Sequence, residues 1–310
     1  MAMKTLKSVG SRTPQNINIE LDTLPENESD ALCRTIISGM SRAFEDPAVM
    51  ADYQNWKKQR QQRKEPPKSY SLRRRCSSVR KLLQQFKKIV FFDTETTGLD
   101  PEKDQIIELA AALVTENGIE LKIDAFCKLP EGEKIPEKIV ELTHITDDML
   151  ADKGIDYREA CRIFCNMLHS NSEVLLVAHN IQFDLLFILE MFKRCGMVPK
   201  APKLRALDSL TVYKDRAAYP HKLTNAIEHY GLADKVQNSH RAIDDVLALY
   251  EVTKAMSEER DDLTDYIDLL GYNPKYGITG RKLRQITYLP QSYKLGCRLP
   301  DLMNGGGSCE

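Results

Sequence analysis

Apolar and polar positions between residues 87 and 257 follow two different periods, as expected of a chain that forms both strands and helices. The run Ile89–Phe92 is continuously apolar, which is typical of a strand buried on both faces. Further strands are predicted at 105–115, 118–127, 173–179 and 204–208. Helices are predicted at 183–194, 223–230 and 241–256.

The order of these elements predicts an α/β fold. The second and third strands are joined by the dipeptide Asn117-Gly118, which favours a tight hairpin and therefore antiparallel pairing. The last two strands are joined through helices, and a helical connection favours parallel pairing. We therefore expect a mixed five-stranded sheet flanked by helices, with its functional edge where the first strand ends.

The segments on either side of this region differ from it in pattern. Residues 1–86 read as a small, mainly helical appendage that ends in a linker, because "KEPPKSYS" contains two prolines that no helix continues. Residues 258–310 read as a C-terminal extension, with the turn-rich segment "YNPKYGITGRK" and a final "NGGGSCE" expected to be disordered. The appendage is predicted to contain a strand at Ile17–Leu21 and helices near 28–45 and 47–64.

Composition narrows the class of protein. The chain has 310 residues, 42% of them hydrophobic, but contains no apolar stretch of about 18 residues that could cross a membrane. Its first residues lack the apolar core of a signal peptide. The eight cysteines show no CxxC spacing, and the nearest pair is Cys161 and Cys165, so zinc ligation and disulfides are both disfavoured. These features predict a cytoplasmic protein with no membrane partner.

Charge is distributed unevenly along the chain. The segment Lys57–Lys88, here called the basic block, holds 13 lysines and arginines and a single acid, Glu65. The whole chain nevertheless carries a net charge of −1, so the remainder is strongly acidic. A basic segment of this kind can follow a polyanion such as nucleic acid. It is equally compatible with a solvated helix and linker, and charge alone does not decide between them.

Four acids and one histidine follow predicted strands or begin predicted helices. Asp93 and Glu95 end the first strand two residues apart, so their carboxylates point to the same face and repel each other unless a cation lies between them. Asp184 falls in the first turn of a helix, where the helix dipole favours a carboxylate. Asp245 lies just over one turn into the last predicted helix, and His240 precedes that helix in a loop.

The four carboxylates are hard oxygen ligands that suit Mg²⁺ or Mn²⁺ better than zinc. A pair of such ions with few protein ligands completes its coordination with water and phosphate oxygens. That arrangement suits the hydrolysis of a phosphodiester, in which one ion activates water and the other stabilises the leaving oxygen. The sequence therefore predicts two divalent cations as cofactors.

The motifs "DTETTG", "AHNIQFD" and "HRAIDD" resemble the three motifs of DEDDh (DnaQ-like) 3′–5′ exonucleases, which have a ribonuclease H-like fold. The resemblance covers roughly residues 87–257 and looks closest to the proofreading exonuclease domains of bacterial replicative DNA polymerases. The segments "IVELTHITDDML" and "LRALDSL" are also similar to parts of those domains. The appendage and the C-terminal extension lie outside this resemblance.

The resemblance implies specific roles for residues of the three motifs. It implies that His240 is the general base that accepts a proton from the attacking water, a task suited to the pKa of imidazole. The residues that it implies as metal ligands are Asp93, Glu95, Asp184 and Asp245. The residues that it implies as contacts to the terminal nucleotide are Thr96, Thr97 and Leu99.

Three functions remain open at this point. The leading one is a 3′–5′ exonuclease that releases nucleoside 5′-monophosphates from single-stranded or frayed ends of DNA. The second is an exoribonuclease with the same catalytic residues. The third is an accessory protein that recruits a polymerase or repair complex, and the intact set of acids and histidine counts against it as a sole function. The expected partners are thus a nucleic acid and a polymerase or repair complex.

Overall fold

A five-stranded sheet organises the part of the chain that the structure, a computed structural model, describes: residues 80–236, 241–291 and 298–303. In order across the sheet, the strands are β3 (Gly118–Phe126), β2 (Ile106–Thr115), β1 (Lys88–Thr96), β4 (Val174–Ala178) and β5 (Leu204–Asp208). The pairs β1–β2 and β2–β3 are antiparallel, whereas β1–β4 and β4–β5 are parallel. The predicted mixed five-stranded sheet is therefore confirmed.

Strand β1 is longer than the predicted 89–93, because its pairing with β2 continues to Thr96. Its first half is the expected strand buried on both faces, with Ile89–Phe92 inaccessible to solvent. In the second half the burial alternates: Thr94 and Thr96 are buried, whereas the acids between and before them are half-buried. This alternation is the strand periodicity that places Asp93 and Glu95 on one face.

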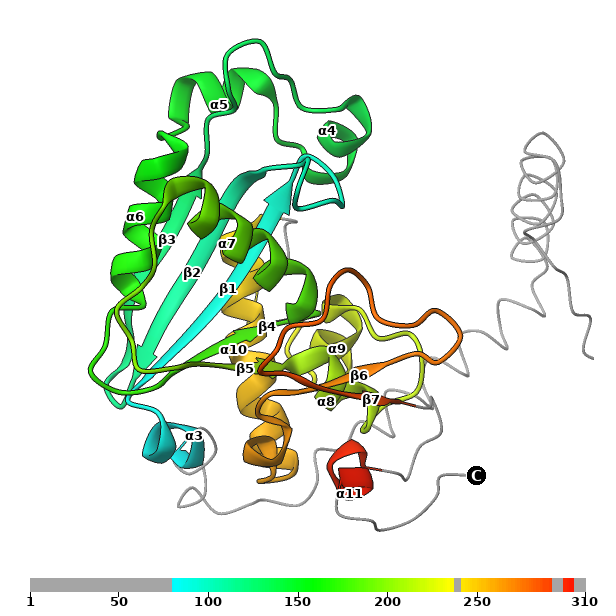
Figure 1. Ribbon diagram of the computed structural model, residues 1–310. Coiled ribbons are helices and arrows are strands. Elements are labelled where there is room, and N and C mark those ends of the chain that lie inside the picture. Colours follow the sequence, from blue (N-terminus) through cyan, green and yellow to red (C-terminus); the bar gives the residue numbers. More distant parts are fainter. Residues whose placement is uncertain (1–79, 237–240, 292–297, 304–310) are drawn as a thin grey trace, which may run out of the picture. The chain divides into compact units, whose positions relative to one another are not determined.

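Helices cover both faces of the sheet (Figure 1). On one face lie α6 (Tyr157–Met167) and α7 (Ile181–Cys195), which pack on Val90 and Phe92 of β1. On the other face lies α10 (Ala242–Glu259), whose Tyr250 meets the ring of Phe91 edge to face with centroids 5.3 Å apart. The sheet is thus the middle of three layers, which is why β1, at its centre, reads as continuously apolar.

Shorter helices complete the domain. Two of them, α4 (Glu137–Thr143) and α5 (Asp147–Lys153), follow β3 and pack around Ile107 and Ile145 in a small separate core. Two more, α8 (Ser209–Lys214) and α9 (Leu223–His229), follow β5. Of these helices, α9 was predicted from the sequence pattern, whereas α4, α5 and α8, and also α6, were not.

The helix α3 (Arg80–Gln85) belongs to the domain core rather than to the segment that precedes it. Leu82 and Phe86 are buried in the same apolar cluster as Ile89 of β1. The appendage was predicted to end at residue 86, but α3 is part of the domain. The appendage therefore stays a prediction for the residues that precede α3. The predicted elements that fall outside the described residues are the strand at Ile17–Leu21, the helices near 28–45 and 47–64, the linker at 64–71 and the tail at 304–310.

The C-terminal extension is folded onto the domain. It contains the 3₁₀ helix η2 (Leu263–Tyr266), the parallel strands β6 (Leu269–Tyr272) and β7 (Thr287–Pro290), and α11 (Leu299–Met303). The two strands form a sheet of their own. Backbone hydrogen bonding ties the extension to β5, because the N–H of Asp268 donates to the carbonyl of Ala206 at 2.7 Å.

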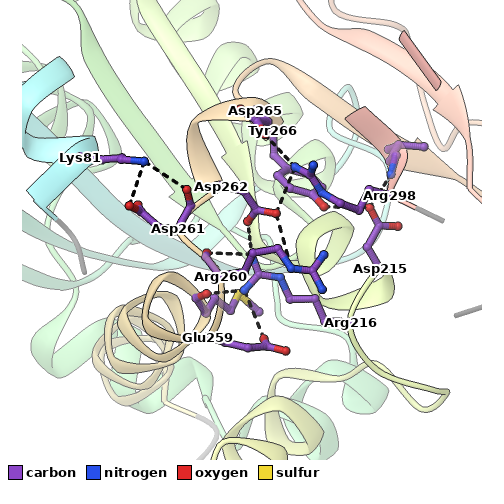
Figure 2. Close-up of polar contacts among 12 residues, drawn as sticks. Lys81, Asp215, Arg216, Glu259, Arg260, Asp261, Asp262, Asp265, Tyr266 and Arg298 are labelled. Atoms are coloured by element: carbon purple, nitrogen blue, oxygen red, sulfur yellow. Dashed lines mark hydrogen bonds and ion pairs between the residues drawn. The ribbon is translucent and has the colours of Figure 1, made fainter. Parts of the chain in front are cut away.

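A buried charge network fixes the same extension to α8 and α10 (Figure 2). The fully buried guanidinium of Arg216 pairs with Glu259 at 3.3 Å and with Asp262 at 2.5 Å. Asp215 accepts hydrogen bonds from the hydroxyl of Tyr266 and from the backbone N–H of Leu299. Buried charges need such partners, so these contacts specify one docked position for the described residues that they join, from Glu259 to Tyr266 and at Leu299.

None of the described helices is both long enough and apolar enough to cross a membrane.

Candidate active site

The carboxyl end of β1 carries the first two acids of the site. Asp93 faces Ala110 and Glu95 faces Glu108 in the antiparallel pairing with β2. Residues opposite each other in such a pair point to the same face, so Asp93, Glu95 and Glu108 all lie on the face covered by α10. Three carboxylates are therefore gathered on one small area of the sheet.

Asp184 reaches the same place from α7. The backbone N–H of Thr94 donates to Oδ1 of Asp184 at 3.0 Å, and the Thr94 hydroxyl donates to the same atom at 2.7 Å. Asp184 is 3% exposed, so both bonds are shielded from water. The buried threonine between Asp93 and Glu95 thus fixes Asp184 beside them.

Asp208 holds the turn that begins α7. Its Oδ1 accepts from the backbone N–H groups of Asn180 at 2.8 Å and Ile181 at 3.1 Å. Asn180 has a positive φ of 72°, and these bonds stabilise that conformation at the N-cap of the helix. Asp208 also caps α8 by accepting from the backbone N–H of Thr211. Its contacts are structural, and they set the direction in which α7 presents Asp184.

His179 has a similar role in the same turn. Its Nδ1 lies 2.8 Å from the hydroxyl of Ser209, and its Nε2 lies 2.8 Å from the carbonyl of His221. The ring therefore bridges the end of β4 to α8 and to the loop before α9. Burial lowers the pKa of His179, so the neutral ring is the favoured form.

The start of α10 is held by an ion pair that the sequence analysis did not predict. The guanidinium of Arg241 donates to Oε1 of Glu108 through Nε at 3.0 Å and through Nη2 at 2.7 Å. The backbone N–H of Ala242, the first residue of α10, donates to Oε2 at 3.3 Å. The guanidinium also lies 4.7 Å from the ring centre of Phe126. These contacts fix the helix turn that carries Asp245 against β2.

The electrostatics of the site show that the acids converge. Burial raises the pKa of Asp93 well above its ordinary value, and the charges of Asp184, Glu95 and Asp245 raise it further. Burial and the charges of Glu108, Asp245 and Asp184 raise the pKa of Glu95 to about 7. Burial raises the pKa of Asp184 to about 7 against the opposing hydrogen bonds from Thr94. Side chains that shift one another in this way lie close together.

A donor set of this kind fits divalent cations. Every member is a carboxylate, and the repulsion that raises the pKa values of Asp93 and Glu95 is relieved when cations lie between the acids. As the side chains lie, no three His, Cys, Asp or Glu residues within the described ranges form a ready-made cage for a metal ion. The Arg241 guanidinium already neutralises Glu108, which leaves Asp93, Glu95, Asp184 and Asp245 as the acids that would hold metal.

The predicted general base, His240, lies outside the described residues. Its neighbour in sequence is Arg241, which is anchored to Glu108.

The end of β1 and the loop after it contain the three residues expected to contact a nucleotide. Leu99 is 83% exposed and projects its apolar side chain into solvent. The hydroxyls of Thr96 and Thr97 are used inside the loop, where they donate to the carbonyl of Gly98 at 2.6 Å and to Asp104 at 3.2 Å. A Cβ at Gly98 would approach the Asp104 carboxylate to 2.4 Å, so a larger residue there would displace the side chain that bonds Thr97. The threonines shape the loop, and Leu99 is the part of it open to a ligand.

The exonuclease family model (RNase_T) matches residues 90–253, more than half of the chain and the whole of the sheet apart from the start of β1. The chain belongs to the exonuclease family. The resemblance to DEDDh exonucleases drawn from the three motifs is thereby confirmed, as is the enzyme class that it implies. Exonucleases of this kind use divalent metal ions.

Relatives of this exonuclease include subunits of DNA polymerases. The DNA polymerase III subunit epsilon of Treponema pallidum is 33% identical over 168 residues, which cover 53% of this chain and 74% of that protein. The PolC-type DNA polymerase III of Staphylococcus haemolyticus is 34% identical over 176 residues, which cover 56% of this chain. The chain spans only 12% of the length of that polymerase.

Solved structures support the fold. The crystal structure of E. coli exonuclease I in complex with a dA16 oligonucleotide matches 58% of this chain and 42% of that chain, with a TM-score of 0.51 and 21% sequence identity. A second exonuclease I structure matches with a TM-score of 0.52 and 20% identity, over 58% of this chain and 43% of that chain. The ribonuclease H-like fold expected from the resemblance is thus confirmed.

Proposed function

We propose that this exonuclease removes nucleotides one at a time from the 3′ ends of DNA, single-stranded or frayed, and releases nucleoside 5′-monophosphates. The observation that carries this proposal is the electrostatic convergence of Asp93, Glu95, Asp184 and Asp245 at the carboxyl end of β1. A phosphodiester is itself anionic, so such a cluster can accept one only together with cations. The all-carboxylate donor set supports Mg²⁺ or Mn²⁺, with two ions shared among the four acids.

Each group of residues has a distinct task in this proposal. The four acids hold the ions, which when bound supply a lowered pKa for the attacking water and a positive charge near the leaving oxygen. His240 accepts the proton of that water, since imidazole has a pKa near neutrality. Leu99, exposed at the mouth of the site, packs against the terminal nucleotide, and the backbone of the loop at Thr96 and Thr97 orients its 3′ end.

DNA is proposed over RNA because the relatives include DNA polymerase III subunits, and a matching fold holds a dA16 oligonucleotide in exonuclease I. The same relatives support a polymerase as protein partner. The chain spans a small part of the PolC-type polymerase, and both proposals concern the whole protein rather than the domain alone.

The proposal is tested with labelled single strands of DNA and RNA of equal length and sequence, incubated with the full chain and Mg²⁺. We expect 5′-monophosphates to accumulate from the 3′ end of the DNA, with slower release from the RNA. A strand whose 3′ hydroxyl carries a bulky group should be degraded far more slowly. Cleavage of a closed circular single strand at the same rate would overturn the exonuclease mode, and faster release from RNA would overturn the choice of DNA. Asp93→Asn is the matched inactive control.

A further inference from the structure

The C-terminal extension carries an exposed basic loop that the family match does not include. The loop between β6 and β7, residues 273–286, contains four cationic side chains and no acid. Those four side chains are all exposed, and they are Lys275, Arg281, Lys282 and Arg284. Tyr276 is 75% exposed in the same loop, with Nζ of Lys275 5.2 Å from its ring centre. Exposed cations around an exposed aromatic ring fit the backbone and bases of a single-stranded nucleic acid.

This loop is attached to the helical turn that carries Asp184. The side-chain amide of Gln182 donates to the carbonyls of Thr279 at 3.2 Å and Arg281 at 2.8 Å, and its Oε1 accepts from the hydroxyl of Tyr288 at 2.7 Å. Gln182 is 6% exposed and lies in the first turn of α7, as does the proposed metal ligand Asp184. In Figure 1 the loop lies alongside α7. One helical turn therefore presents an acid to the site and an amide to the basic loop.

A pocket lies between the loop and the start of α7. It has a volume of about 240 Å³, and its walls include Phe183, Lys214, Tyr272 and Tyr276 together with the N-cap residue Asn180. Phe183 is the residue immediately before Asp184, so the pocket and that acid share one helical turn. Its lining combines aromatic rings and a lysine with the carboxylate of Asp208, and the rings and the lysine are groups that bind bases and phosphates.

The position of the loop is fixed by the rest of the extension. The pairs of the buried Arg216 with Asp262 and Glu259, and the bonds of Asp215 to Tyr266 and Leu299, attach the extension to the domain (Figure 2). The loop therefore has a fixed position on the surface of the domain.

We propose that the β6–β7 loop binds the single strand upstream of the nucleotide being removed, with its cations on the phosphates and Tyr276 stacked on a base. The inference rests on the proposed function, since it names the path of that substrate. The occupant is a single-stranded nucleic acid rather than an acidic protein, because the loop adjoins the site that must receive a 3′ end.

The test compares variants of the full chain on a fluorescent single strand of about 20 nucleotides. Binding is measured by anisotropy in excess chelator so that the strand stays intact, and hydrolysis is measured separately with Mg²⁺. The triple variant Lys275→Ala, Arg281→Ala, Lys282→Ala should weaken binding by about 10-fold and flatten the log–log salt slope by roughly 2, since each phosphate contact contributes about 0.7. Tyr276→Ala should weaken binding by about 10-fold, and Tyr276→Phe should restore it because the ring still stacks.

Hydrolysis gives an independent readout. KM for the long strand should rise by about the same factor in the triple variant, whereas kcat and the hydrolysis of a dinucleotide should not change. The matched control removes three exposed lysines on other elements, Lys122, Lys200 and Lys203, and should leave binding and KM unchanged. Failure to hydrolyse any strand would contradict the proposed function. The comparison of strand binding between wild type and the triple variant would still test the loop proposal. Normal hydrolysis with unchanged binding, salt slope and KM in the triple variant would overturn the loop proposal alone.

Discussion

Glu108 of β2 accepts two hydrogen bonds from the guanidinium of Arg241, at 3.0 and 2.7 Å, and thereby joins the sheet to the first turn of the helix that carries Asp245. Glu108 is fully buried, and its opposite residue on β1 is Glu95. The pair therefore does two things at once. It fixes α10 beside the site, and it neutralises an acid that would otherwise repel the proposed metal ligands.

Removing the guanidinium should destabilise the protein and lower its turnover. Arg241→Ala leaves Glu108 buried without its cation, and breaking such a pair should cost about 2–3 kcal/mol, at the low end because the guanidinium is one-third exposed. Turnover should fall because the helix start and the neighbouring loop lose their anchor. Denaturant unfolding and single-turnover hydrolysis measure the two effects.

A double variant tests whether the stability lost in Arg241→Ala comes from the broken ion pair with Glu108. Glu108→Gln together with Arg241→Gln should recover much of the lost stability, because neither partner is then left charged and buried. Arg162→Ala, which removes the exposed partner of Glu159, is the matched control and should leave unfolding unchanged. Equal stability of wild type and Arg241→Ala would contradict the anchoring role.

Divalent cations should control both activity and stability. Excess chelator should abolish hydrolysis, and Mg²⁺ or Mn²⁺ should raise the melting temperature of the metal-free protein by relieving repulsion among the four acids. Asp93→Asn keeps the shape but removes one buried negative charge. It should melt at an equal or higher temperature than wild type without metal, respond less to added cation, and lose activity. Full hydrolysis in excess chelator would exclude the metal proposal.

Much of this site was predictable because each acid follows a recognisable pattern. Asp93 and Glu95 directly follow a continuously apolar run in a strand. Asp184 lies in the first turn of a helix that follows a second apolar strand. The roles of Glu108 and Arg241 were not predictable, because they depend on a strand register and on a contact between residues 133 positions apart. Glu108 in "IIELAA" reads as one polar residue in a buried strand, which is itself the only local signal that it needs a partner.

The fold, like the site, was predictable only in part. The strands β1 to β5 were predicted to within a few residues because their apolar runs end in clear turn signals, such as Asn117-Gly118, whereas β6 and β7 were not predicted. The helices α4 and α5 are only 7 residues each and form a small core with Ile107, so they lack the long periodicity that identifies a helix. The C-terminal extension reads as turns, and its docking depends on the buried Arg216, whose partners lie more than 40 residues away.

Substitution of His240 tests the proposed base. His240→Ala should reduce turnover by about 10²–10⁴-fold, the usual contribution of a positioned general base. Binding of a single strand in chelator should change little, because the acids and the surface around them remain. The two readouts are single-turnover hydrolysis and anisotropy. The neighbouring substitution Asn238→Ala in the same segment is the control, and an unchanged turnover in His240→Ala would remove the histidine from the mechanism.

His179 should make stability depend on pH. Burial lowers the pKa of this ring in the folded protein, while the unfolded chain keeps the ordinary value of 6.5. The unfolded state therefore binds the proton first as pH falls, and the folded state loses stability below about pH 6.5. His179→Gln lacks this titration, so the difference in unfolding free energy between wild type and variant should shrink from pH 8 to pH 5. A constant difference over that range would show that the ring does not titrate between the two states.

The basic block ends where β1 begins, and two of its described members, Lys81 and Lys88, have partners in the domain. Lys81 pairs with Asp261 at 2.8 Å, and Lys88 donates to the carbonyl of His169 at 2.7 Å. Lys88 and Asp93 are the two ends of a five-residue step along β1, about 17 Å at the usual rise of a strand. A nucleic acid that contacts both Lys88 and the acids must therefore span about this distance.

This distance gives the block a length-dependent test. Deleting residues 1–79 keeps α3, whose Leu82 and Phe86 are core residues, so the domain should stay folded. If the block binds phosphates, the deletion should raise KM and flatten its salt dependence for long strands, and leave KM for a dinucleotide unchanged. Turnover at saturation should not change in either case, because the proposed metal ligands remain. Identical KM and salt slope for the full and shortened chains on a long strand would instead make the block a linker or a docking segment for a protein partner.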